Sequence, residues 1–257
     1  MKKYIADIRI AAIVLTASAA AFAACTSEEY IVEEQPAEPQ LYTLTVAASK
    51  GEDAATRALS LEDKTLNAAW ATSEHVYVQK SGTWASGSLQ PQTGGATATL
   101  KGTLGGIAIA ADDNLTLQFP RSGELSYAGQ AGTLADIAAN FDYATATVEV
   151  ESVSASGSIN PKAATTTFTN RQAIIQFTLK KSDGSPLPGN PTAFTVSDGT
   201  STVSLTDIPA ATYTTNGDCV LFVAFPATSS AATITLTATV GSATYTYERS
   251  GVTFTNG

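Results

Sequence analysis

Apolar and polar side chains alternate along most of this chain, and this pattern restricts the folds available to it more than any other feature. Close to the amino-terminal end, Tyr42, Leu44 and Val46 alternate with two threonines. The same alternation recurs in four later segments, residues 115–119, 148–151, 175–180 and 234–240. Residues two apart in a strand lie on the same face of a sheet, so each segment predicts a half-buried β-strand. The run 220–225 is apolar throughout, which predicts a central strand buried on both faces.

Turn-forming residues separate these segments at intervals that are typical of an all-β protein. Gly, Ser, Asn, Asp and Pro cluster at residues 81–82, 94–95, 182–191 and 215–218. Short strands divided in this way predict β-sandwich architecture, with one short helix at 133–140. A polar stretch before Asn170 and a new strand-rich block after it predict two tandem antiparallel β-sandwich domains, residues 41–170 and 171–257.

The first 24 residues have the pattern of a signal peptide. Lys2, Lys3 and Arg9 precede an uncharged apolar run of about fifteen residues, shorter than the roughly twenty that a membrane-spanning helix needs. Residues 22–25, Phe-Ala-Ala-Cys, resemble the lipobox of bacterial lipoproteins, although leucine is commoner than phenylalanine at the first position. The resemblance implies cleavage between Ala24 and Cys25 and acylation of Cys25, for example with palmitate, which would attach the chain to outer-membrane lipid.

Residues 25–40 are expected to be a lipidated acidic tether. The segment contains two prolines and five glutamates, Glu28, Glu29, Glu33, Glu34 and Glu38. A segment of this composition cannot bury enough apolar surface to fold, so it predicts a solvated linker. It also resembles the acidic export signal that follows the lipidated cysteine in Bacteroidetes lipoproteins, which implies a surface-exposed protein in the outer membrane. An ordinary linker is the alternative interpretation.

The charge balance restricts the partners of the mature chain. Residues 1–24 carry three basic residues and one acidic residue, so of the 14 basic and 23 acidic residues of the whole chain, 11 and 22 remain. The resulting net charge of about −11 argues against nucleic acid and anionic lipid as electrostatic partners. We therefore expect no nucleic-acid partner.

Few residues could support catalysis or bind a cofactor. Cys219 lies in an apolar run and is expected to be a core residue, because the chain offers one histidine, His75, to activate a nucleophile. One histidine also cannot build a histidine-rich metal site. Residues 112–114, Asp-Asp-Asn, and the glycine-containing residues 102–106 are better explained as turns than as calcium-binding or phosphate-binding loops. The sequence predicts no catalytic, cofactor or metal site and no enzyme.

Six short motifs occur in a characteristic order along the mature chain. They are residues 41–46 (Leu-Tyr-Thr-Leu-Thr-Val), 56–60 (Thr-Arg-Ala-Leu-Ser), 69–70 (Ala-Trp), 76–78 (Val-Tyr-Val), 168–175 (Phe-Thr-Asn-Arg-Gln-Ala-Ile-Ile) and 223–226 (Val-Ala-Phe-Pro). In this order they resemble the Bacteroidetes fimbrillin family, the subunits of type V pili, and the resemblance covers most of the mature chain. It implies transthyretin-like, Greek-key sandwiches and a structural or adhesive subunit of a cell-surface pilus.

The resemblance also implies proteolytic processing between Arg57 and Ala58. In that family a protease cuts after an arginine that follows the first strand, which frees the subunit from its lipid and from that strand. The surrounding residues 50–58 are rich in Gly, Ala, Asp and Thr, as in loops that proteases cut. A solvated loop arginine is the alternative. Loss of the first strand, residues 41–46, would open a groove where Tyr42, Leu44 and Val46 had packed. A neighbouring pilin subunit could fill that groove by β-strand addition.

Two further questions stay open at the level of sequence. Fimbrillins usually continue beyond the equivalent of Gly257, so the chain is either a tip or minor pilin with no strand to donate, or a truncated chain whose second domain lacks its last strand. The alternative to a pilin is an uncleaved surface lipoprotein that binds glycan or a host protein through exposed aromatic residues. The candidates are Trp70, Trp84, Tyr127, Tyr143, Tyr245 and Tyr247.

Overall fold

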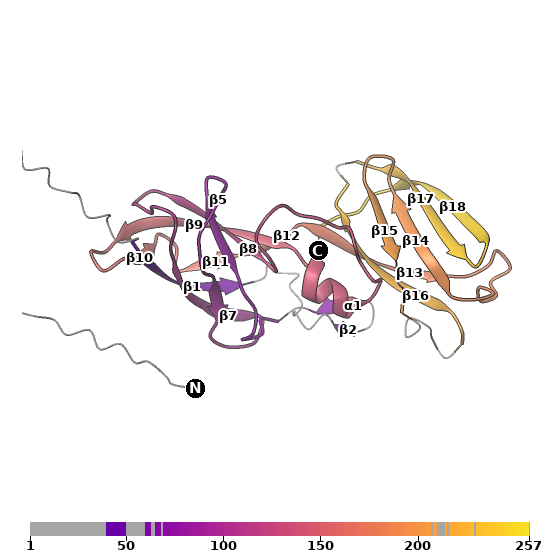
Figure 1. Ribbon diagram of the computed structural model, residues 1–257, viewed down its shortest axis with the longest axis horizontal. Helices are drawn as coiled ribbons and strands as arrows, with labels where there is room; N and C mark the ends of the chain where they lie inside the picture. The colour runs from indigo at the N-terminus through magenta and orange to yellow at the C-terminus, as the bar shows by residue number, and fades with distance from the viewer. Residues whose placement is uncertain are drawn as a thin grey trace, which may run out of the picture. The chain divides into compact units, whose positions relative to one another are not determined.

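The described part of the chain is all-β, as predicted, with one short helical segment (Figure 1). A computed structural model describes residues 40–49, 60–62, 65–67, 69–206, 208–209, 214, 216–228 and 230–256. Outside the two larger groups of strands described below, a short hairpin pairs β2 (Ser60–Glu62) with β3 (Thr65–Asn67).

The first half of the chain forms a ten-stranded sheet whose main path runs β5-β4-β8-β9-β10-β1-β7-β6. Its strands are β1 (Tyr42–Ser49), β4 (Tyr77–Lys80), β5 (Thr83–Trp84), β6 (Leu89–Pro91), β7 (Thr97–Leu104), β8 (Asn114–Phe119), β9 (Ala144–Val153) and β10 (Ser158–Pro161). Two short strands lie off this path: β11 (Thr165–Thr167) pairs with β1, and β12 (Thr169–Asn170) pairs with β9.

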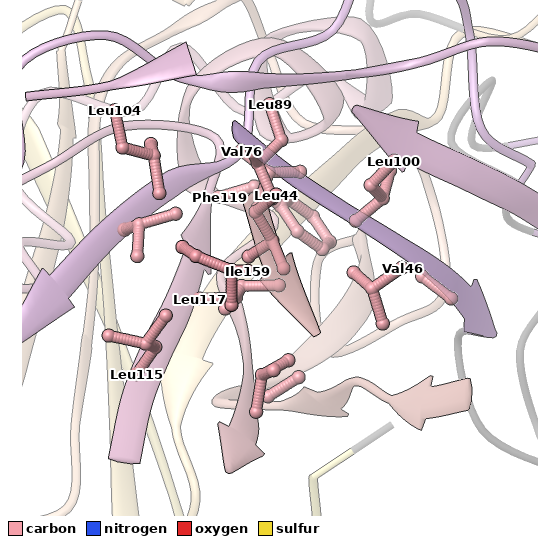
Figure 2. Packing of buried hydrophobic residues seen from close by; sticks show 14 of the residues in the cluster. Leu44, Val46, Val76, Leu89, Leu100, Leu104, Leu115, Leu117, Phe119 and Ile159 are labelled. Atoms are coloured by element: carbon pink, nitrogen blue, oxygen red, sulfur yellow. The ribbon is translucent and has the colours of Figure 1, made fainter. Parts of the chain in front are cut away.

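The predicted alternation accounts for the core of this sheet. Every second residue is buried in β1, and the same alternation holds along most of β7 and β9, with threonines at many of the positions between the buried residues. The buried side chains of all these strands meet in one hydrophobic cluster, part of which is shown in Figure 2. Three aromatic rings lie at its centre: Trp70, Phe119 and Phe168 are pairwise 5.3 Å apart between ring centroids.

The second half contains two further sheets. One is two-stranded and pairs β13 (Gln172–Leu179) with β16 (Cys219–Pro226). The other is four-stranded, in the order β15-β14-β17-β18, with β14 (Pro191–Ser197), β15 (Thr202–Thr206), β17 (Ala232–Val240) and β18 (Ala243–Val252). Side chains from both sheets form a second hydrophobic cluster that includes Phe194, Leu221 and Val223. The predicted strand 220–225 is therefore β16, and it is largely buried, as expected, but the prediction of a central strand is wrong, because β16 is one of two strands in its sheet.

The expected helix is present between β8 and β9. Thr133 caps it, since the Thr133 hydroxyl accepts a hydrogen bond from the Asp136 amide, and α1 (Leu134–Asp136) continues into the π-helical turn η1 (Ile137–Phe141). Ile137, Phe141 and Tyr143 pack with Ala224 of β16. A segment inserted between two strands of the first sheet thus contacts a strand of the second half. The division into domains at residues 170 and 171 stays a prediction.

The aromatic centre gives a direct test of this core. Phe168→Ala would remove a fully buried ring that contacts two others, so we expect a loss of about 3–5 kcal/mol in the free energy of unfolding. Thr165→Ala, on an exposed position of β11, should change it by less than about 0.5 kcal/mol. Urea unfolding of both variants measures the difference. Equal effects would contradict the core assignment.

Candidate functional site

The first strand, β1, lies inside the sheet and has neighbours on both sides. It pairs with β7 in antiparallel fashion along its whole length, from Tyr42 opposite Leu104 to Ser49 opposite Thr97. On its other side it pairs in parallel with β10 through Thr43 and Leu44, and with β11 through residues 47–49. Removal of β1 would therefore open a slot with two strand edges.

The inward side chains of β1 belong to the hydrophobic core. Tyr42, Leu44 and Val46, the residues predicted for a displaced strand, are 3%, 0% and 2% exposed. Figure 2 shows Leu44 and Val46 among the leucine, valine, isoleucine and phenylalanine side chains of the neighbouring strands. Burial of three side chains of this size stabilises β1 in the sheet by on the order of 5–9 kcal/mol, in addition to its main-chain hydrogen bonds. The sheet therefore holds β1 strongly.

The strand is shifted toward the carboxyl terminus relative to the prediction. Residues 41–46 were expected, whereas β1 runs from Tyr42 to Ser49. Leu41 is 59% exposed and outside the strand, and Ala48 is a further buried position. The residues after Val46, Ala-Ala-Ser, give only a weak apolar signal, which is why the sequence pattern ends too early. Since β1 ends at Ser49, Arg57 follows eight residues later.

Two glycines fit the sheet closely around β1. The Thr43 amide donates a hydrogen bond to the Gly157 carbonyl oxygen at 2.9 Å, and a Cβ atom at Gly157 would lie 2.2 Å from the Leu41 carbonyl oxygen. Gly157 also has a φ of +80°, which side chains other than that of glycine rarely adopt. Gly102, opposite Leu44 in β7, has a similar constraint, because a Cβ there would lie 2.1 Å from the Ser88 carbonyl oxygen. Gly157 carried no distinguishing signal in the sequence. The prediction of a turn at residues 102–106 is wrong for its first three residues, which belong to β7, because the close packing at position 102 requires a glycine within the strand.

The predicted processing residues lie outside the described residues. These are Ala24 and Cys25 at the signal-peptide cleavage site and Arg57 and Ala58 at the protease site. The structure therefore brings together the three predicted residues of the displaced strand, and the lipidation and cleavage sites stay predictions.

Cys219 and His75, the two residues considered for catalysis or metal binding, lie far apart in burial: one is in the core and the other is near the surface. The Cys219 thiol is fully buried in β16, and His75 contacts the side chains of Ser88 and Gln90 near the surface. Among the residues that the structure describes, no three His, Cys, Asp or Glu side chains are grouped closely enough to hold a metal ion.

Asp112 and Asp113 lie in the turn before β8, and Asn114 is the first residue of that strand. The Asp113 carboxylate accepts hydrogen bonds from the Lys80 ammonium at 2.6 Å and from the Ala110 amide at 2.7 Å. Both hydrogen bonds lower the pKa of Asp113, and the one from Lys80 has the larger effect. Asp112, at a φ of 64°, pairs with Lys162 on the surface. Both carboxylates therefore take part in ion pairs that connect the turn to neighbouring strands.

The six aromatic candidates for a binding surface divide into buried and exposed residues. Trp70 and Tyr143 are buried, and Trp84 is half-buried. Tyr127 is also half-buried, donates a hydrogen bond to the Arg171 carbonyl oxygen, and burial raises its pKa to about 12. Tyr245 and Tyr247 in β18 are exposed, by 36% and 58%. They line a cavity of about 760 Å³ together with residues of β13 and β17.

No family model, curated protein or solved structure matches the chain. Within the described residues, no helix has the length and apolar character required to span a bilayer.

Substitution within β1 tests how strongly the sheet holds this strand. Leu44→Ala should lower the free energy of unfolding by about 2–5 kcal/mol, because it leaves a cavity in the core. Thr45→Ala changes the next residue, whose side chain is exposed, and should cost less than about 0.5 kcal/mol. Chemical denaturation followed by tyrosine and tryptophan fluorescence measures both values. A mild effect of Leu44→Ala would show that β1 is only loosely held.

The Asp113 ion pair predicts a pH dependence. Because the folded-state pKa of Asp113 is lowered, its carboxylate stabilises the fold above the unfolded-state pKa of about 3.9, and this contribution is lost as the pH falls through the folded-state value. Asp113→Asn should therefore reduce stability by on the order of 1 kcal/mol at neutral pH. The difference from the wild type should shrink below about pH 4.

Asp112→Asn is the matched control for this experiment. The Asp112 side chain is 80% exposed, so its replacement should have little effect at any pH. Thermal unfolding at several pH values compares the two variants. A deficit of Asp113→Asn that is independent of pH would contradict the assigned role of the carboxylate.

Proposed function

We propose that this chain is a structural and adhesive subunit of a cell-surface pilus, a tip or minor pilin, that assembles by strand exchange. It would be exported as a lipoprotein, held in the outer membrane by acylated Cys25, and cut between Arg57 and Ala58. Removal of β1 would then prepare the subunit for a strand from a neighbouring pilin subunit. The resemblance of six ordered sequence motifs to fimbrillins supports the family assignment.

The observation that carries the proposal is the position of β1. It is the first of the described strands in the sequence, it has alternating buried side chains, and it lies between strand neighbours on both sides. The chain that follows it reaches Arg57 eight residues after Ser49. A cut there would separate β1 covalently from the rest of the sheet, and non-covalent contacts would hold it until another strand took its place.

The slot would select the incoming strand by pattern and direction. Its walls are β7, which is antiparallel to β1, and β10 with β11, which are parallel to it. A donor strand could bond to both edges through its main chain and would need apolar side chains at the four positions of Tyr42, Leu44, Val46 and Ala48. Repetition of this contact from one subunit to the next does not close on itself and produces a filament.

We further propose that the two halves of the chain are tandem Greek-key sandwiches of the transthyretin-like kind. The separate hydrophobic clusters of the ten-stranded sheet and of the last six strands support this division.

The alternative function is an uncleaved surface lipoprotein that binds glycan or a host protein. The exposed Tyr245 and Tyr247 beside a cavity favour that alternative.

Replacement of Arg57 separates the two functions. Arg57→Ala should leave the protein at its full mature size, bound to the membrane through its lipid and absent from filaments, because the protease would lack its arginine. The wild type should be shortened to a chain that begins at Ala58 and is released from lipid. Immunoblotting of membrane and filament fractions measures size and location.

Lys50→Ala is the matched control, because it removes another basic residue from the segment that joins β1 to β2. It should be processed like the wild type. If the wild-type protein is never shortened and stays attached to lipid, the polymerising-pilin function is wrong.

A further inference from the structure

The two sheets in the second half of the chain differ in width. The sheet β15-β14-β17-β18 has four strands, and the sheet that packs on it, β13-β16, has two. Residues of both sheets share one hydrophobic cluster, in which the Phe177 and Phe194 rings lie 5.3 Å apart between centroids. A two-stranded sheet cannot cover the inner face of a four-stranded one, so part of the inner face depends on other cover.

On one side the chain supplies this cover itself. The Gln130 side chain accepts a hydrogen bond from the Ala224 amide at 2.8 Å and donates one to the Ala224 carbonyl oxygen at 2.7 Å. The Phe222 amide donates to the Gly132 carbonyl oxygen, and Gln130 forms an isolated bridge with Leu205 of β15. A Cβ at Gly132 would lie 2.7 Å from a methyl group of Leu205 and 3.1 Å from one of Leu221. Residues 130–132 thus close the gap between β15 and β16.

On the opposite side no described strand closes the gap between the two sheets, although residues 180–182 and Leu187 of the connection from β13 to β14 line part of the space. There β13 pairs with β16 alone and β18 with β17 alone, so each presents one free main-chain edge. Between them lies the cavity of about 760 Å³, lined by Leu179, Leu236, Tyr245 and Tyr247 among others. We call this cavity with its two edges the open groove.

Strand β18 lacks the features that keep other edges of this protein from pairing. The edge strands β5 and β6 have two and three residues, and β6 ends in Pro91. By contrast, β18 has ten residues, contains neither lysine nor proline, and is exposed from Ala243 to Gly251, and its charged residues and β-bulge are confined to residues 248–251. Long exposed edges without such protection pair readily with another strand. The charges of Glu248 and Arg249 balance, so the strand itself is neutral.

We propose that the open groove is closed by a second copy of this chain, in a two-fold symmetric dimer. In this dimer β18 of each copy lies beside β13 of the other. Each two-stranded sheet then continues into the four-stranded sheet of the partner copy, which gives two six-stranded sheets that cover one another. Tyr245 and Tyr247 of both copies become buried between them, and all four free edges are paired.

The symmetry follows from the strand counts. Four strands facing two leave an uncovered face, whereas two copies related by a two-fold axis place six strands opposite six. An isologous contact of this kind uses the same surface on both copies and closes at two subunits. A glycan could stack on the tyrosines, but it would leave the edges of β13 and β18 unpaired. The proposal concerns only the second half of the chain and does not depend on cleavage at Arg57.

Sedimentation velocity tests the dimer directly. The sample is the chain from residue 25 onward with Cys25→Ser, which lacks only the predicted signal peptide and lipid. We expect a reversible monomer–dimer equilibrium without larger species. Each copy carries a net charge near −11, so added salt should screen the mutual repulsion and strengthen association.

Two variants make the test specific to the open groove. Tyr247→Asp should weaken dimerisation by at least about tenfold, because it places a charge where a central aromatic side chain is buried. Ser204→Asp adds the same charge to an exposed position of β15, the opposite edge strand of the sheet, and should dimerise like the unmodified chain. Circular dichroism and thermal unfolding should show that both variants are folded.

Hydrogen exchange gives a second measurement that does not depend on substitution. Amides of β13 and β18 should exchange more slowly as protein concentration rises, and the exchange rates of β15 amides should not change.

A chain that stays monomeric at every concentration, with the amides of β13 and β18 unprotected, would overturn the proposal. Oligomers larger than a dimer that grow with concentration would contradict the two-fold dimer and indicate a head-to-tail contact. A monomer that binds to a glycan array and loses that binding on Tyr247→Asp would assign the groove to sugar instead.

Discussion

The pairing of β1 on both of its sides is the interaction on which the rest of the first sheet depends. β1 joins β7 to β10 and β11, and its inward side chains fill the centre of the core (Figure 2). A strand in the middle of a sheet cannot be removed without leaving a slot of its own shape. The same contacts that stabilise the precursor would therefore define which strand can replace β1 in an assembled protein.

The sequence was a good guide wherever the period of hydrophobicity was strong. Leu44 and Val46 in β1, and Leu115 and Leu117 in β8, are buried as their alternation predicts, and the short helix begins after Thr133 as expected. The pattern failed at the end of β1, because Ala48 is too small and too common on surfaces to mark a buried position. The period of hydrophobicity shows which face of a strand is buried, but it does not show which strands lie next to one another.

Long-range contacts explain what the sequence could not show. Gln130 is fully buried, and its side chain bonds both main-chain groups of Ala224, a residue 94 positions away. Gly132 fits between Leu205 and Leu221, where a Cβ atom has no room. These residues close one side of the pair of sheets in the second half of the chain, and no equivalent segment closes the other side, where the open groove lies. Nothing in the local sequence of β13 or β18 distinguishes a covered edge from a free one.

The amino-terminal residue of the protein in assembled surface filaments tests the central claim most directly. If β1 is a temporary strand, mass spectrometry of that material should find a chain that begins at Ala58 and lacks residues 25–57. The lipid on Cys25 would then hold only the precursor. A filament protein that retains acylated Cys25 and β1 in one continuous chain would contradict the account.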